Sequence, residues 1–180
     1  MNIKMCARCN LCKNQQPLLD EIKKCQICWV GLSAKIVKHD DEGPLSPTTN
    51  SGKLISNVES NFYGISTYRT NLVKCVPLDE LQKLRYPNNK EIESCFPNLK
   101  DELNELTPRI VFLLGDKVAT AVSKQFNIEF NEWDDFRYAY TEFNGTYYVP
   151  IHHPSYIYVY KRKHVQLYVD GISEMICQLV

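Results

Sequence analysis

The run RIVFLLG, residues 109–115, is almost continuously hydrophobic. A second run of this kind, CQICWVG, covers residues 25–31. Strands that are apolar on both faces are typical of a parallel sheet covered by helices on both sides. Two further apolar segments, STYRTNLV at 66–73 and TYYVPIH at 146–152, predict additional strands.

Helical patterns alternate with these segments, at residues 52–64, 91–106, 116–126 and 162–179. This alternation predicts a three-layer α/β/α sandwich with a central, mostly parallel four-stranded sheet. We expect one domain over residues 1–180, to which a cysteine segment at residues 1–12 contributes. Ligands of such sheets bind beyond the carboxyl ends of the strands. The segments of interest therefore follow Val30, Val73, Leu114 and Ile151.

The composition is that of an ordinary globular protein, with 44% hydrophobic and 23% charged residues. No apolar run is long enough to predict a membrane span, and the N-terminus lacks the apolar core of a secretory signal. We therefore expect a cytoplasmic, monomeric protein. The formal net charge is zero, so any contact with DNA has to come from a local basic patch.

The cysteines indicate metal chemistry, because a reducing cytosol disfavours disulfides. Cys6, Cys9 and Cys12 form two overlapping C-x-x-C units, a spacing that recurs in zinc and iron–sulfur sites. One such unit supplies half of a site, and Cys75 and Cys95 are the candidates for the other half. The spacing leaves open whether Cys6 and Cys9 or Cys9 and Cys12 are used.

The remaining cysteines are expected to be packing residues. Cys25 and Cys28 also lie three apart, but in a predicted strand, where such residues point to opposite faces. Cys177 lies in the last predicted helix.

Several short motifs occur in the order of a known family. They are CARCNL (6–11), CWVGLSAK (28–35), GPL (43–45) with GKLI (52–55), TNLVKC (70–75) with a later Cys95, PRIVFLLG (108–115) and HPSY (153–156). On these motifs nearly the whole chain resembles the iron–sulfur, family 4-like uracil-DNA glycosylases. The resemblance implies a DNA glycosylase that flips a base, expected to be uracil, out of DNA and hydrolyses its N-glycosidic bond.

The resemblance also assigns residues. A [4Fe–4S] cluster would be held by Cys6, Cys9, Cys75 and Cys95, with zinc as the alternative metal. His153 would donate to the departing base, and the base would be bound by Gly31, Leu32, Leu45 and Asn71. Apart from the resemblance, we expect phosphate contacts from Ser51, Gly52 and Lys53, at the start of a predicted helix. Further DNA contacts are expected from Ser155, Tyr156, Lys161 and Arg162. The segment 156–158 is expected to be a loop that serves as an apolar wedge.

Some of these residues also have plainer interpretations. The alternative for Asn71 is a strand-end residue that satisfies backbone groups, and the alternative for the basic run 161–163 is a solvated face.

Two positions depart from the family pattern. The first loop, GLSAK at 31–35, lacks the acidic residues that handle the attacking water, so Asp40 or Asp41 is the candidate; a solvated acidic turn is the alternative. Leu45 replaces a phenylalanine that stacks on uracil. These departures keep two alternatives open: a glycosylase for another modified or damaged base, and a non-catalytic nucleic-acid-binding relative.

Overall fold

Five strands form one sheet in the computed structural model, which describes residues 3–21, 23–37, 39 and 42–180. The strands are β1 Ile27–Ser33, β2 Thr67–Val73, β3 Ile110–Leu114, β4 Thr141–Phe143 and β5 Thr146–Ile151. Their order is β2-β1-β3-β5-β4, and all neighbours are parallel except β4, which is antiparallel to β5. The predicted three-layer, mostly parallel sandwich is confirmed. The predicted strand number was wrong, because a three-residue edge strand adds a fifth.

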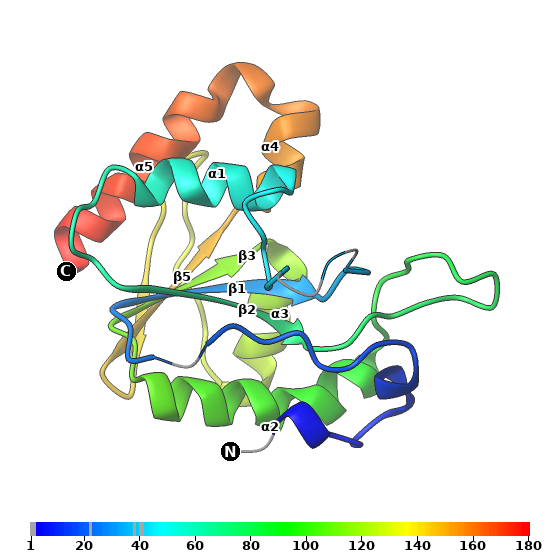
Figure 1. The fold of residues 1–180 in the computed structure, drawn as a ribbon. Coiled ribbons are helices and arrows are strands. Elements are labelled where there is room, and N and C mark those ends of the chain that lie inside the picture. Colours follow the sequence, from blue (N-terminus) through cyan, green and yellow to red (C-terminus); the bar gives the residue numbers. More distant parts are fainter. Residues whose placement is uncertain (1–2, 22, 38, 40–41) are drawn as a thin grey trace.

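The helices cover both faces of this sheet (Figure 1). They are α1 Asn50–Glu59, α2 Asn89–Leu106, α3 Asp116–Phe126, α4 Pro154–Tyr160 and α5 Val165–Leu179, with short 3₁₀ turns at Ile3–Met5, Asn10–Lys13 and Arg162–His164. We call the apolar cluster under α1, α4 and α5 the α1 core, and the cluster under α2 and α3 the α2 core. No helix in the described part of the chain is long and apolar enough to cross a membrane.

Strand β3 shows why the hydrophobic run predicted this fold. Ile110, Phe112 and Leu114 are buried in the α1 core, whereas Val111 and Leu113 are buried in the α2 core. Alternate residues of a strand point to opposite faces, so a central strand between two helical layers has to be apolar throughout.

Two boundaries differ from the prediction in ways that affect the site. β1 extends to Ser33, so Gly31 lies inside the strand rather than in the following loop. Residues 156–158 were expected to be a loop but belong to α4, which begins with Pro154 in its first turn and has His153 as its N-cap. Proline fits this position because its missing N–H has no partner there in any helix.

The register brings the candidate segments together. Gly31 pairs with Asn71, Val30 with Leu113, and Leu114 with Ile151. The carboxyl ends of β1, β2, β3 and β5 therefore meet at one edge of the sheet, where a ligand site is expected.

Candidate active site at the carboxyl edge of the sheet

Asn71, Gly31 and Leu45 converge at this edge. Asn71 is buried near the end of β2. A Cβ atom added to Gly31 would lie 2.5 Å from Asn71 Oδ1 and 3.1 Å from Leu45 Cδ2. The missing side chain at position 31 thus lets the amide and the Leu45 side chain approach the strand.

Leu45 adopts a left-handed conformation, with φ of +50°, which is rare for a residue with a branched side chain. Arg69 holds this turn: its Nη1 donates to the Leu45 carbonyl at 2.9 Å, and its Nη2 donates to Ser56 Oγ at 2.9 Å and forms an ion pair with Glu59. Strand β2 therefore fixes Leu45 against α1.

His153 stands at the end of β5. Ser155 N–H donates to His153 Nδ1 at 3.2 Å, and Ser155 Oγ lies 2.6 Å from the same nitrogen. Burial, followed by the nearby charge of Lys35, lowers the pKa of His153. Because Nδ1 accepts the Ser155 N–H, the neutral ring carries its proton on Nε2, which can act as a donor.

His152 has different surroundings from its neighbour. Its Nδ1 lies 3.1 Å from Tyr138 Oη, and its ring packs against Trp133 and Tyr156. Burial lowers its pKa as well. These aromatic contacts make His152 a packing residue at the edge of the α1 core.

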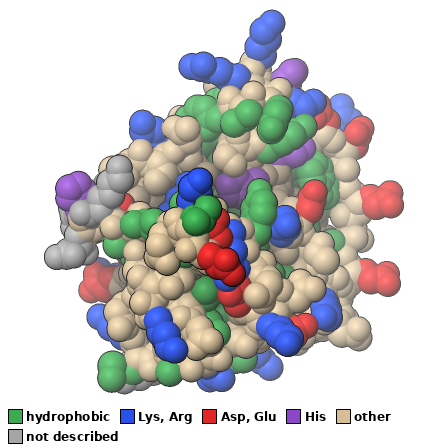
Figure 2. Space-filling model, turned by 90° about the vertical axis from the view of Figure 1, so that its right-hand side faces the viewer, with side chains coloured by type: hydrophobic (Ala, Val, Ile, Leu, Met, Phe, Trp, Pro, Cys, Tyr) green, Lys and Arg blue, Asp and Glu red, His purple; other side chains and the backbone are tan. Residues whose placement is uncertain are grey.

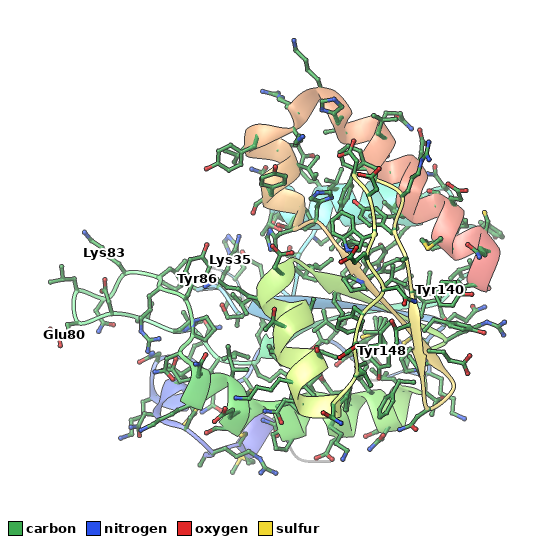
Figure 3. The ribbon with its side chains drawn as sticks, turned by 180° about the vertical axis from the view of Figure 1, so that it is seen from behind. Lys35, Glu80, Lys83, Tyr86, Tyr140 and Tyr148 are labelled. Carbon is green, nitrogen blue, oxygen red and sulfur yellow. The ribbon has the colours of Figure 1, made fainter. Side chains whose placement is uncertain are left out.

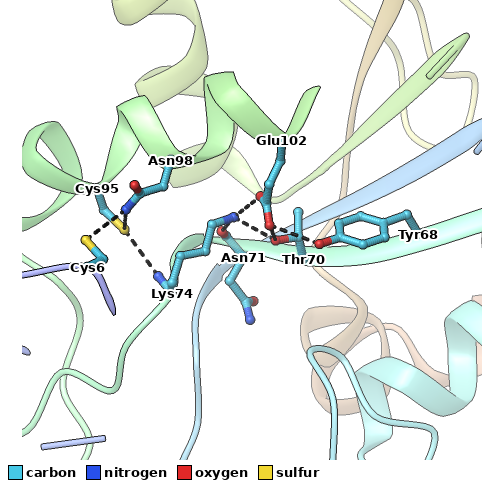
Figure 4. A network of polar contacts seen from close by, with 8 residues as sticks. All are labelled: Cys6, Tyr68, Thr70, Asn71, Lys74, Cys95, Asn98 and Glu102. Carbon is cyan, nitrogen blue, oxygen red and sulfur yellow. Dashed lines mark hydrogen bonds and ion pairs between the residues drawn. The ribbon is translucent and has the colours of Figure 1, made fainter. Parts of the chain in front are cut away.

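Five cysteines line one small pocket, Cys6, Cys9, Cys12, Cys75 and Cys95. The Lys74 backbone N–H donates to Cys95 Sγ at 3.3 Å, and Asn98 Nδ2 donates to Cys6 Sγ at 3.3 Å (Figure 4). Burial and then the neighbouring Cys95 raise the pKa of Cys75 to about 12. Among the described residues, no three His, Cys, Asp or Glu side chains are arranged to hold a metal ion.

Two kinds of metal centre would use such thiols differently. A single zinc needs its thiolates around one point, whereas a [4Fe–4S] cluster binds each thiolate at a different corner. Donors to sulfur, such as the Asn98 amide, stabilise the negative charge of such a group.

A buried ion pair adjoins both the pocket, which Lys74 lines, and Asn71 (Figure 4). Lys74 Nζ pairs with Glu102, and both side chains are fully buried. Lys74 also donates to Thr70 Oγ1 at 2.7 Å and to the Asn71 carbonyl at 2.6 Å, and Tyr68 donates to Glu102 at 3.0 Å. The network ties β2 to α2, while the Asn71 side chain points away from it.

The expected DNA-binding residues fall into two groups. At the start of α1, Ser51 and Gly52 are buried, and the Gly52 N–H is taken by the Thr49 hydroxyl at 3.0 Å. A Cβ on Gly52 would lie 2.0 Å from the Ser46 carbonyl oxygen, so this glycine is needed for the close packing of α1 against the preceding turn. Of Ser51, Gly52 and Lys53, Lys53 is the exposed residue.

The second group surrounds α4. Tyr156, Val159 and Tyr160 are exposed on this helix, and Lys161 and Arg162 follow it. Figure 2 shows apolar and basic side chains above histidines on the face toward which the strands point. Ile157 is fully buried and cannot form part of a wedge.

Other predicted residues are placed as follows. Leu32 packs against the α2 core, away from Leu45. Asp40 and Asp41 lie outside the described residues. Cys25 and Cys28 are buried as expected, but both lie in the α2 core, because the strand begins only at Ile27. Cys177 was expected to pack and is instead exposed.

Sequence reasoning missed Arg69 and the Lys74–Glu102 pair. The sequence TYRTNLVK, residues 67–74, nevertheless indicates buried charges, because charged residues interrupt an otherwise strand-like segment. Charged residues are seldom fully buried unless they are paired, so the sequence indicates that Arg69 and Lys74 each need an acidic partner.

The chain is similar to known proteins in sequence and in fold. The chain is 26% identical over 169 residues to a type-4 uracil-DNA glycosylase of Saccharolobus solfataricus, covering 85% of this chain and 72% of that protein. The fold is similar to the crystal structure of wild-type Pedobacter heparinus SMUG2, with a TM-score of 0.56, 16% identity, and coverage of 87% of this chain and 76% of the other. The model of the uracil DNA glycosylase superfamily matches residues 15–175, a span that holds Gly31, Asn71 and His153. With the parallel sheet and the groups at its carboxyl edge, this match shows that the chain belongs to the uracil DNA glycosylase superfamily.

Proposed function

We propose that this protein is a DNA N-glycosylase that flips uracil out of DNA and hydrolyses its N-glycosidic bond. The observation that carries the proposal is that β2, which holds Asn71, and β5, which leads into His153, end at the same carboxyl edge of a superfamily sheet. Asn71 offers a donor and an acceptor, which suits the edge of a pyrimidine.

His153 supplies the donor that the departing base needs. Cleavage leaves negative charge on the base, and the neutral ring, whose Nδ1 accepts from Ser155, carries on Nε2 the proton that it can donate. Removing a donor of this kind costs about 3 kcal/mol, or roughly a hundredfold in rate. Asp40 or Asp41 remains our proposal for the group that positions the attacking water.

Leu45 and Gly31 shape the base site in this proposal. The left-handed turn at Leu45, fixed by Arg69, sets its side chain against Gly31 and Asn71. An aliphatic side chain stacks on a base more weakly than an aromatic ring does. The stacking free energy for an aromatic ring is about 1–3 kcal/mol per base.

This aliphatic contact favours one second candidate function, excision of another modified or damaged base. The first loop supports it, because no Asp or Glu occurs in the sequence between Gly31 and Lys38.

We further propose a [4Fe–4S] cluster held by Cys6, Cys9, Cys75 and Cys95. The choice of Cys6 over Cys12 rests on hydrogen bonds: Asn98 donates to Cys6, whereas Cys12 Sγ donates to the Cys9 carbonyl at 3.2 Å. When bound, such a cluster would link the N-terminal segment to β2 and α2. Its role would be structural, because hydrolysis of the N-glycosidic bond involves no electron transfer. Zinc stays the alternative.

The DNA strand would lie across α4, with the exposed apolar residues Tyr156, Val159 and Tyr160 filling the gap left by the flipped base. Lys161 and Arg162 would contact phosphates beside it.

The experiment is a glycosylase assay with labelled single- and double-stranded oligonucleotides that contain uracil, followed by alkaline cleavage at abasic sites. We expect cleavage with the wild type and about a hundredfold less with His153→Ala. Binding of uracil-containing DNA without any abasic site, from uracil or from a panel of modified bases, would refute the catalytic proposal.

A further inference from the structure

A finger of chain, residues 77–87, projects from the carboxyl edge between β2 and α2 (Figures 1 and 3). It has a defined shape without a core of its own. Leu78 and Leu84 form a β-bridge, and the Asp79 carboxylate accepts from the N–H groups of Leu81 at 2.9 Å and Lys83 at 2.8 Å.

The base of the finger is anchored to α2. Arg85 donates to both carboxylate oxygens of Glu91, at 2.8 and 2.6 Å, and its Nε donates to the Leu78 carbonyl at 2.9 Å. Glu91 also forms the capping box of α2 with Asn88. The finger is therefore preorganised, which lowers the ordering cost of a contact made through it.

The finger exposes an aromatic ring beside the candidate site. Tyr86 is 69% exposed, and Lys117 Nζ lies 4.2 Å from its ring centroid. Lys117 is the second residue of α3, which begins directly after Gly115. A Cβ on Gly115 would lie 3.1 Å from His153 Cβ, so the path from Tyr86 to His153 is short.

Positive charge accompanies this ring. The charge of Lys35 acts on the His153 imidazole, and Lys117 covers one face of Tyr86 while the rest of the ring is open. Figure 3 shows Lys35, Lys83 and Tyr86 on this side of the molecule. Aromatic rings interleaved with lysine are the groups on which single strands stack.

We infer that Tyr86, with Lys117, forms a stacking platform for a nucleotide that neighbours the base at His153. The inference rests on the proposed function and adds a second DNA contact, opposite α4. The contact lies at the base of the finger, because the exposed carboxylate of Glu80 at the tip would repel phosphates.

The test uses the full-length protein and a fluorescent single-stranded oligonucleotide that carries a tetrahydrofuran abasic-site analogue, which cannot be cleaved. Fluorescence anisotropy should show binding about 5- to 100-fold weaker for Tyr86→Ala, the range expected for the loss of one stack. Tyr86→Phe keeps the ring and should bind like the wild type. Tyr63→Ala is the matched control, since Tyr63 is also exposed but precedes β2, at the opposite edge of the sheet.

The outcomes separate this inference from the proposed function. If the wild type excises a base and Tyr86→Ala binds as tightly as Tyr63→Ala, the platform is refuted and the glycosylase proposal stands. Equal losses for Tyr86→Ala and Tyr86→Phe would refute stacking in favour of a hydroxyl contact. A wild type that neither binds DNA nor excises any base refutes both.

Discussion

A methyl group at position 31 would collide with the amide that we assign to base recognition. In Gly31→Ala the new Cβ would lie 2.5 Å from Asn71 Oδ1, whereas ordinary contacts begin at 3.4 Å. The amide oxygen must therefore retreat by about 0.9 Å. Gly31 does not have a positive φ, so alanine adds no backbone strain and the collision is the main effect.

A displacement of about 1 Å at a reacting group costs on the order of a hundredfold in rate. We expect kcat/KM for uracil excision to fall by about that factor in Gly31→Ala, measured under single-turnover conditions. Overpacking should lower the free energy of unfolding by about 1–3 kcal/mol, which a urea titration would record.

Gly43→Ala is the matched control, because a Cβ at Gly43 meets nothing within 4 Å. Its activity should stay within about twofold of the wild type, as for other neutral surface changes. If Gly31→Ala excises the base as fast as Gly43→Ala, the amide of Asn71 does not recognise the base and our site is misassigned.

Three further predictions concern the charged groups and the thiols. Lys74→Met leaves Glu102 buried without its partner and should cost about 3–5 kcal/mol of unfolding free energy in a urea titration; a loss below about 1 kcal/mol would contradict the buried pair. The pKa of His153 is lowered from 6.5, so its ring should titrate below that pH by NMR. Excision should persist at pH 6.5 and fall only as the pH drops through the lowered pKa. The native state should lose stability as the pH falls from 6.5 through that lowered pKa, because the unfolded chain binds the proton more readily; a midpoint at or above 6.5 would contradict the lowered pKa. Cys95→Ser should lose bound iron and sulfide while the exposed Cys177→Ser keeps them; equal iron in both would exclude Cys95 as a ligand.

The fold was predictable where the sequence repeats one physical pattern. The apolar runs at β1 and β3 follow from burial on both faces. Strand β4 escaped prediction because TEF is three residues long and lies at a half-exposed edge. Helix α4 escaped because its apolar residues face both the core and solvent, so PSYIYVY has no helical period.

The sequence predicted which residues belong to the candidate site, but not how these residues are arranged in space. Motifs placed Asn71 and His153 at strand ends, and the register then brought those ends together. The partners of Arg69 and Lys74 could not be read from the sequence, because Glu59 and Glu102 reach them from helices that only tertiary packing brings alongside β2. The local pattern shows that these buried charges need partners, but it does not identify the partners.

Release of free base from DNA is the decisive test of glycosylase activity. We would incubate the purified wild type and His153→Ala with uracil-containing oligonucleotides and quantify free uracil by mass spectrometry. We expect stoichiometric release by the wild type and about a hundredfold slower release by His153→Ala. Release at equal rates by both proteins, or by neither of them, would contradict this expectation.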